Sequence, residues 1–458
     1  MKILHLGNVA MNAYSNAKFL RRKGIEADVL VLDYTYIMSQ PEWEDAYFEE
    51  EIKDEWHPDW SKVNLHGFKR PKWFKEYLTG APQSVPESKS IKGRWWTIKN
   101  TILFGFYLRE GLRIRGFIER ERQKYLKMER LSAFKKNGIA EKMKHIFSGI
   151  KVIGRFQTKY SHIRFLKSII NKYDIIQAYG NEVITAVLAA SEKPLVSFEH
   201  GTMRDILLAD SSTNRLLILA YNKSKKCIIT NPDGKITADK IGLNNYVFIP
   251  HPVDTEKFSP HETKFRKKIM DETGAELIFF APARNDWWIK NNDKIIEAFS
   301  DYLKNAEKKT VLIFCEWGRD IEKSKNYINK LGIGKYVIWT PPLSKTILAE
   351  HYNASDVVLD QFLLGVFGGI PPEAMACAKP VITKFDWEVN KWAWPEKPPV
   401  VPAASSQEIF ESMKLLAQNE NLRKELGKRG RIWMEKYHSW ELVAEKQIKI
   451  YKEILNNG

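Results

Sequence analysis

The stretch from Val357 to Asp386 constrains the fold more than any other part of this chain. It reads VVLDQFLLGVFGGIPPEAMACAKPVITKFD, which is an apolar strand, a glycine-rich loop, a helix and a second apolar strand. Units of this kind build parallel sheets that are covered by helices. The pattern therefore predicts an α/β fold.

The loop within this stretch has the features of an anion site. Its glycines, Gly365, Gly368 and Gly369, let backbone N–H groups approach a ligand closely. Pro371 and Pro372 then open the helix, where a missing N–H has no cost. The unpaired N–H groups of a helix start attract phosphate. An ordinary strand-to-helix crossover would have the same sequence, so both interpretations stand at this point.

Glu373 follows in the first turn of this predicted helix. A carboxylate at that place can hold hydroxyl groups of the molecule that carries the anion. Phosphate and sugar hydroxyls together indicate a nucleotide-sugar as the ligand.

The length of 458 residues predicts two large domains. No apolar run is long enough to span a membrane, and the opening MKILHLGNVAMNAY is typical of a first core strand rather than of a signal peptide. Cys227, Cys315 and Cys377 stand apart in apolar runs, which favours a reduced, cytoplasmic protein. We find no zinc-ligand spacing and no Asp-x-Asp pair, so the sequence predicts neither a metal nor a cofactor.

Residues 1–33 read as a βαβ unit with a helix over 12–23. The turn between strand and helix lacks the GxGxxG spacing of a dinucleotide site. Asn8, Asn12 and Ser15 have two interpretations. They bind a polar acceptor at the carboxyl edge of the sheet, or they cap the helix.

Residues 40–165 are expected to form an insertion on the first domain. The net charge of +16 lies mainly here, because residues 94–167 hold 19 Lys and Arg against 5 Asp and Glu, a surplus of 14. Within 101–131, five of the eight Lys and Arg residues fall on one side of a predicted helix. Three roles fit such a face: an anionic membrane surface, plain solvent exposure, or nucleic acid. The cations are Arg109, Arg113, Arg120, Lys124 and Lys127.

Three further candidates stand at the ends of predicted strands. His200 leaves the strand PLVSFE and precedes Gly201, so it is placed for a phosphate or a sugar hydroxyl, unless it is a structural histidine. Arg284 ends the strand ELIFFAPA, and Lys290 follows six residues later, just before a predicted helix. Two cations at such a turn suit a diphosphate. Glu316 ends another strand, where a nucleoside base would lodge.

Three segments of the chain resemble segments of one family, glycosyltransferase family 4, the retaining "glycosyl transferases group 1" enzymes. The resemblance covers residues 170–458 and the first 35 residues. It implies a GT-B fold, in which two Rossmann-like domains face each other across a cleft: residues 1–253, residues 254–437, and a helix over 438–458 that crosses back. The segments are IPHPVDTEKFSP for the linker, GVFGGIPPEAMACAKPVI for the donor loop and helix, and HSWELVAEKQIKIYKEIL for the closing helix.

The resemblance also implies residue roles. Arg284 and Lys290 match the pair that binds the donor diphosphate and stabilises the leaving group, and Glu373 matches the acid that binds ribose. His200 resembles the histidine that faces the transferred sugar. The loop amides that meet the phosphates match Gly368, Gly369 and Ile370.

The chain departs from the family pattern at two places. The family's first acid, which contacts the transferred sugar, corresponds to Gly365, so Asp360 and Gln361 are the candidates to replace its contacts. The usual glycine after the lysine is Asn291, which adopts positive φ more readily than most residues.

The implied activity is metal-independent, retaining transfer of a sugar from a nucleoside-diphosphate sugar to an acceptor hydroxyl, with domain closure about the linker. The basic segment suggests a lipid-linked or polysaccharide acceptor of the cell envelope, and a peripheral place on the inner face of the membrane. Two other classes remain open. One is a catalytically silent GT-B subunit that binds a nucleotide or a partner, and the other is a nucleic-acid-binding protein that uses residues 94–167.

Overall fold

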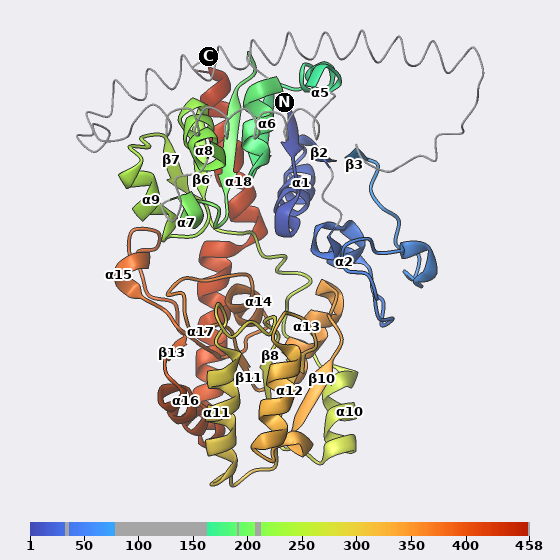
Figure 1. The fold of residues 1–458 in the computed structure, drawn as a ribbon, viewed down its shortest axis with the longest axis vertical. Helices are drawn as coiled ribbons and strands as arrows, with labels where there is room; N and C mark the ends of the chain where they lie inside the picture. The colour runs from blue at the N-terminus through green and yellow to red at the C-terminus, as the bar shows by residue number, and fades with distance from the viewer. Residues whose placement is uncertain (33–35, 78–162, 190–191, 207–211, 457–458) are drawn as a thin grey trace, which may run out of the picture.

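Two parallel β-sheets, one above the other and each covered by helices, make up the protein in a computed structural model (Figure 1). The structure describes residues 1–32, 36–77, 163–189, 192–206 and 212–456. The α/β architecture predicted from the strand–helix alternation is therefore confirmed. The basic helix predicted over 101–131, with the five cations on one of its sides, lies outside the described residues.

The N-terminal sheet has seven parallel strands in the order β3-β2-β1-β4-β5-β6-β7. Alternate residues of each strand point to opposite faces. Ile3 packs with α1 and α18, whereas Leu4 packs on the other face with α6 and α8. Its elements are β1 (Lys2–Leu6), α1 (Asn12–Arg22), β2 (Glu26–Leu32), β3 (Phe74–Tyr77), α5 (Ile163–Ile170), β4 (Ile175–Tyr179), α6 (Glu182–Ala189), β5 (Leu195–Glu199), α7 (Met203–Ile206), α8 (Ser212–Lys223), β6 (Lys226–Ile229), α9 (Gly234–Lys240) and β7 (Tyr246–Phe248), with α18 (Trp440–Asn456) docked from the end of the chain.

The C-terminal sheet has six parallel strands in the order β10-β9-β8-β11-β12-β13. Phe279 faces α11 and α16, while Phe280 faces α13 and α17. Its elements are α10 (Lys264–Thr273), β8 (Leu277–Ala281), α11 (Asn292–Leu303), β9 (Thr310–Cys315), α12 (Ile321–Lys330), β10 (Val337–Thr340), α13 (Lys345–Ala354), β11 (Val357–Leu359), α14 (Ile370–Ala376), β12 (Val381–Thr383), α15 (Trp387–Asn390), β13 (Val401–Pro402), α16 (Ser406–Gln418) and α17 (Glu420–His438).

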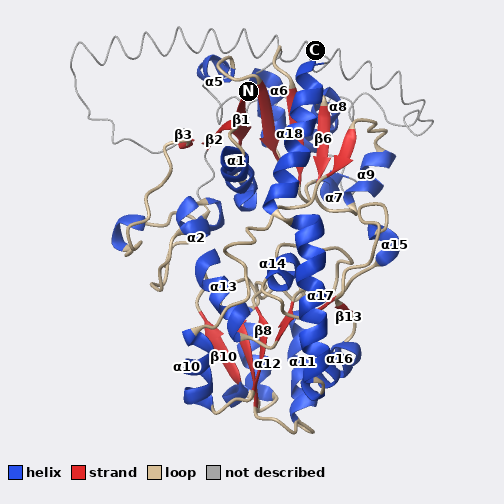
Figure 2. Ribbon diagram, turned by 180° about the vertical axis from the view of Figure 1, so that it is seen from behind, coloured by secondary structure: helices blue, strands red, loops and turns tan. Residues whose placement is uncertain are grey.

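The chain crosses between the two sheets twice, and the crossings lie side by side. The Val253 amide donates to the carbonyl of His438, and the Trp440 amide donates back to the carbonyl of Val253, at 2.8 and 3.1 Å. Helix α18 then continues the line of α17 up to the N-terminal sheet (Figure 2). Both connections between the two sheets therefore meet at one place.

Residues 36–68 form a small unit beside the N-terminal sheet. It has its own apolar cluster around Trp43 and Phe48, and it contains helix α2 (Pro41–Asp45). Within the segment predicted to be an insertion, residues 74–77 pair with β2 as the edge strand β3, so this part belongs to the sheet. Three short 3-10 turns, η1 (Val9–Met11), η2 (Ile37–Ser39) and η3 (Trp60–Lys62), also lie in this half, and η5 (Gly334–Tyr336) lies in the other.

Candidate functional site

The two predicted cations stand where β8 ends. The Arg284 side chain is 46% exposed, and its Nε lies 3.7 Å from the buried carboxylate of Asp286. Lys290 follows after one turn. Asn291, the residue before α11, has a φ of 55°, which confirms the positive φ expected there. Asp286 also accepts a 2.8 Å hydrogen bond from Arg319, which follows β9. The edge of the sheet thus carries a third cation.

Arg319 had no signal in the sequence that distinguished it from other surface cations. It enters the site because β9 lies beside β8 in the sheet and because Asp286 holds both guanidinium groups. Asp286 is only 7% exposed, so it fixes the position of two more exposed arginines.

The glycine-rich loop follows β11, the neighbour of β8 on its other side. Gln361 holds this loop from within: its Oε1 accepts from the amides of Leu363 and Leu364 at 3.1 and 2.6 Å, and its Nε2 donates to the carbonyl of Val366 at 3.1 Å. Gln361 is 2% exposed and its amide is hydrogen-bonded inside the loop, so it shapes the loop.

The amides predicted to meet phosphate are accessible. In the part of the chain that the structure describes, no protein group accepts a hydrogen bond from the N–H of Gly368, Gly369 or Ile370. Helix α14 begins at Ile370, with prolines in its first turn as predicted. These N–H groups therefore remain available at the same sheet edge as the cations.

Gly365 is a packing position. A Cβ atom built there would lie 2.6 Å from Cβ of Asp386 and 3.2 Å from its amide nitrogen. The Gly365 carbonyl accepts from the amide of Asp386 and from the side chain of Asn390, at 3.0 and 2.7 Å. The position therefore has no room for the acid that the family pattern has.

Asp360, the other candidate for the missing contact, is 1% exposed. Neither carboxylate oxygen has a hydrogen-bond partner, and Oδ1 lies 3.9 Å from the Lys290 ammonium. Burial raises the pKa of Asp360, and the charge of Lys290 opposes this shift. Asp360 thus lies beneath Lys290 and away from solvent.

Glu373 lies in the first turn of α14 and is 8% exposed. One carboxylate oxygen pairs with the ammonium of Lys345, and the other accepts a 3.2 Å hydrogen bond from Tyr352. Burial raises its pKa, whereas Lys345 lowers it. A carboxylate has more acceptor sites than these two bonds use, so Glu373 can also accept from a hydroxyl. Lys345 and Tyr352, both on α13, were not predicted.

His200 leaves β5 of the N-terminal sheet and is partly buried, with no hydrogen-bond partner for Nδ1. Burial and the nearby Arg204 guanidinium lower its pKa to about 4. The imidazole is therefore neutral at pH 7, with one nitrogen able to donate and the other able to accept.

Asn8 and Asn12 are used within the protein. Asn8 is fully buried: its Nδ2 donates to the carbonyl of Ser39 at 2.7 Å, and its Oδ1 accepts from the amide of Tyr14 at 2.9 Å. Asn12 donates to the carbonyl of Val9 at 2.8 Å. Asn8 therefore pairs with an amide in the first turn of α1, as a capping residue does, whereas Asn12 is the first residue of α1 and makes no capping bond. Ser15 lies partly buried on the next turn of α1.

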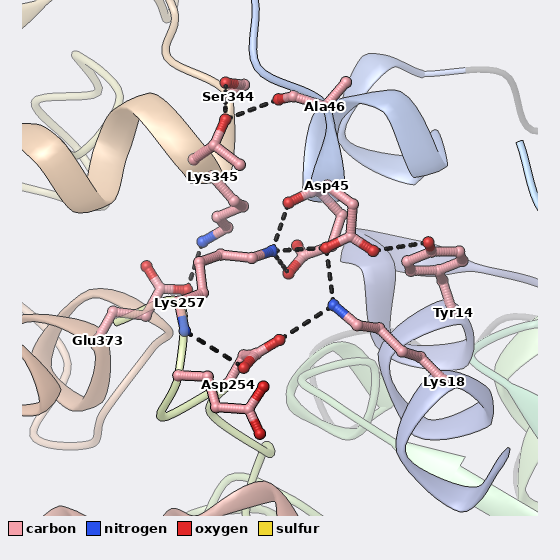
Figure 3. Close-up of polar contacts among 12 residues, drawn as sticks. Tyr14, Lys18, Asp45, Ala46, Asp254, Lys257, Ser344, Lys345 and Glu373 are labelled. Atoms are coloured by element: carbon pink, nitrogen blue, oxygen red, sulfur yellow. Dashed lines mark hydrogen bonds and ion pairs between the residues drawn. The ribbon is translucent and has the colours of Figure 1, made fainter. Parts of the chain in front are cut away.

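Charged groups join the two halves of the protein next to Glu373. Asp45 of α2 lies 2.7 Å from Lys18 of α1 and 2.8 Å from Lys257, which follows the linker (Figure 3). Although burial raises the pKa of Asp45, Lys257 and Lys18 bring it below the ordinary value. Thr346 of α13 donates a 2.6 Å bond to the carbonyl of Ala46. Helix α2 therefore bridges α1 and α13.

The remaining candidate, Glu316, pairs with Lys325 at the end of β9 and is partly exposed. Among the described residues, no group of three His, Cys, Asp or Glu side chains could hold a metal ion. No described helix has the length and apolar content to cross a bilayer.

Comparisons with known proteins agree with this geometry. Residues 262–433 match the family model "Glycosyl transferases group 1". An uncharacterized glycosyltransferase of Methanocaldococcus jannaschii is 22% identical over 327 residues, which are 64% of this chain and 80% of that protein.

Two solved structures share the fold over the full length of both chains. Sucrose-phosphate synthase from Thermosynechococcus elongatus has a TM-score of 0.62 at 13% identity. HepE from Anabaena, in a structure with UDP-glucose, has a TM-score of 0.61 at 13% identity. The two-sheet architecture is therefore that of the GT-B fold.

Proposed function

The chain belongs to the glycosyl transferases group 1 family, and we propose that it moves a sugar from a nucleoside-diphosphate sugar to an acceptor hydroxyl with retention at the anomeric carbon. The observation that carries this proposal is the convergence at one sheet edge. Arg284 and Lys290 follow β8, and the glycine-rich loop follows the neighbouring β11. Cations and unpaired amides then meet where a diphosphate would lie.

In this proposal the donor diphosphate lies between the cations and the loop. Arg284 and Lys290 offset the negative charge that develops as the diphosphate leaves, and the amides of Gly368, Gly369 and Ile370 donate to its oxygens. Fixed donors of this kind stabilise a transition state by about 3 kcal/mol each. Glu373 accepts from the ribose hydroxyls, and Lys345 keeps its carboxylate in place.

Neutral His200 lies on the opposite, N-terminal half, where it can hydrogen-bond the transferred sugar. Retention without an obvious carboxylate nucleophile leaves the departing phosphate to take the acceptor's proton. HepE was determined with UDP-glucose, so UDP-sugars are the first donors to test. Movement about the paired crossings at Val253 and Ser439 would bring the two halves together.

The donor is tested by calorimetric titration of UDP-, GDP- and ADP-sugars into the wild type and into Arg284→Ala. We expect one donor series to bind, with affinity reduced about tenfold or more in the variant because a charge-assisted contact is lost. Arg429→Ala is the control, since Arg429 is exposed on α17 and pairs only with Glu425 among the described residues. Equal affinity in both variants would contradict the proposed site.

For the acceptor, we propose a lipid-linked or polysaccharide glycan at an anionic membrane surface. The support is the surplus of 14 positive charges over residues 94–167 in the sequence. Replacing Arg109, Arg113, Arg120 and Lys124 with Glu should abolish binding to anionic vesicles. Retained binding in this variant would remove the membrane part of the proposal. Salt-sensitive RNA binding that is lost in the same variant would favour the nucleic-acid alternative.

A further inference from the structure

Asp360 is a buried acid that the packing of the C-terminal sheet does not use. It follows β11 and is 1% exposed, and neither carboxylate oxygen has a hydrogen-bond partner of good geometry. The amide of Gln361 lies close enough to lower the pKa of Asp360, but its effect is smaller than that of Lys290. An acid with a purely structural role at a strand end would accept hydrogen bonds from backbone amides or side chains. A buried charge without such bonds needs a counter-charge.

Lys290 supplies that counter-charge. Its ammonium lies 3.9 Å from Oδ1 of Asp360, and its backbone carbonyl accepts a 3.3 Å hydrogen bond from the amide of Phe362. The turn that carries Lys290 is thus tied to the strand end that carries Asp360. The Lys290 side chain is 21% exposed, so its ammonium lies between the buried acid and the open edge of the sheet.

The packing around Gly365 explains why the contact between Asp360 and Lys290 matters for the site. An acid cannot stand at position 365, because its Cβ would meet Asp386 at 2.6 Å. The other acid in the described residues of the β8–α11 turn and the glycine-rich loop is Asp286, which pairs with Arg284 and Arg319. Asp360 is the acid that faces Lys290.

We propose that Asp360 is a positioning residue that holds the Lys290 ammonium at the sheet edge, where it meets the donor diphosphate. This inference rests on the proposed function. Asp360 touches no donor atom in this role and acts only through Lys290. The titratable groups that interact with Asp360 are Lys290 and the phenol of Tyr352 on α13.

A double-mutant cycle on nucleotide binding tests this proposal. UDP, GDP and ADP are titrated into the wild type, and the tightest of them is then used with Asp360→Asn, Lys290→Met and the double variant. We expect each single change to weaken binding about tenfold and the double variant to bind no more weakly than Lys290→Met alone. The control pair is Asp360→Asn with Arg284→Met, for which the two losses should multiply.

The outcomes separate this inference from the proposed function. A wild type that binds none of the three nucleotides overturns both. A wild type that binds, together with unchanged affinity in Asp360→Asn, overturns the positioning role alone. Losses that multiply in the double variant with Lys290→Met also overturn it, because Asp360 would then act independently of Lys290.

A measurement of stability tests the same proposal without the Asp360→Asn variant, in case that variant does not fold. Lys290→Met leaves the buried Asp360 without its counter-charge, and a buried carboxyl is least costly when it is protonated. The urea midpoint of Lys290→Met should therefore fall further below that of the wild type at pH 8 than at pH 5.5. Arg284→Met should show the same difference at both pH values. Equal pH dependence of the two variants would overturn the proposal.

Discussion

The Lys257 ammonium lies 2.8 Å from the carboxylate of Asp45, and this contact joins the segment after the linker to helix α2 of the other half (Figure 3). Lys257 also lies 2.8 Å from Glu44. The Lys257 side chain is 13% exposed, so removing it leaves two carboxylates largely buried and without this partner. The bridge is therefore a largely buried contact between the two halves.

We predict that Lys257→Met lowers the free energy of unfolding by about 3 kcal/mol, because removing one partner of a buried ion pair leaves uncompensated charge. Urea denaturation of the whole chain checks this. The matched control is Lys62→Met, whose ion pair with Asp59 at 2.9 Å lies in solvent, and there we expect no measurable change. A similar small effect in both variants would show that the bridge does not hold the halves together.

Gly365 leads to a second prediction. Gly365→Ala should lower the free energy of unfolding by about 1–3 kcal/mol, since the added methyl group meets Asp386 and forces the loop to move. Gly368→Ala is the control three residues away, because no heavy atom lies within 4 Å of its added Cβ. Thermal unfolding of both variants compares them.

The same packing predicts the result of restoring the family acid. Gly365→Glu should be less stable than Gly365→Ala and should show no gain in sugar transfer. A variant that is as stable as the wild type and transfers faster would mean that the loop accommodates the acid, contrary to the geometry.

The sequence predicted those parts of the site that depend on residues close together along the chain. Arg284 and Lys290 directly follow an apolar strand, and the glycine-rich loop lies between two strands, so their place at a sheet edge could be inferred. Asn291 with positive φ is also a local property, and the structure confirms it. The alternation of strands and helices along the chain was sufficient to predict two parallel sheets.

The side-chain contacts that complete the site depend on the order of the strands in the sheet. That order could not be inferred from the sequence. Asp360 meets Lys290, 70 residues earlier, only because β11 pairs with β8. Arg319 reaches Asp286 because β9 pairs with β8 on the other side. The sequence predicted that Gly365 lets backbone amides approach a ligand, and only the approach of Asp386 reveals a packing constraint there.

A third prediction concerns the docking of the last helix. Gln447 of α18 is 1% exposed, its Nε2 donates to Asn16 at 2.9 Å, and its Oε1 accepts from Gln177 at 3.2 Å. Gln447→Leu should lower the free energy of unfolding by about 1–3 kcal/mol, because it removes the hydrogen bond to the buried Oδ1 of Asn16 and one of the two that Gln177 donates. Urea denaturation gives the loss, and limited proteolysis should release the C-terminal helix sooner. Lys449→Leu, at an exposed position of the same helix, is the control and should leave both unchanged.

The last prediction is a pH dependence carried by His438 at the junction of α17 and α18. This histidine is 3% exposed, its ring stacks on Trp394, and its Nδ1 lies 3.2 Å from the carbonyl oxygen of His251. Burial lowers the pKa of His438 to about 3, although the His251 carbonyl opposes the shift. The imidazole therefore stays neutral in the folded protein at pH values at which it is protonated in the unfolded chain.

The sign follows from the lowered pKa. Between about pH 6.5 and pH 4 the unfolded chain binds a proton at His438 that the folded protein does not bind, so stability is present above this window and is lost as the pH falls through it, by about 1.4 kcal/mol per pH unit. His438→Gln should make the plot of unfolding free energy against pH less steep by that amount between pH 6 and pH 5. His57→Gln, at an exposed position, should leave the slope as it is in the wild type. If His438→Gln retains the full slope, the acid sensitivity arises from other buried groups and the junction is open enough for His438 to be protonated in the folded protein.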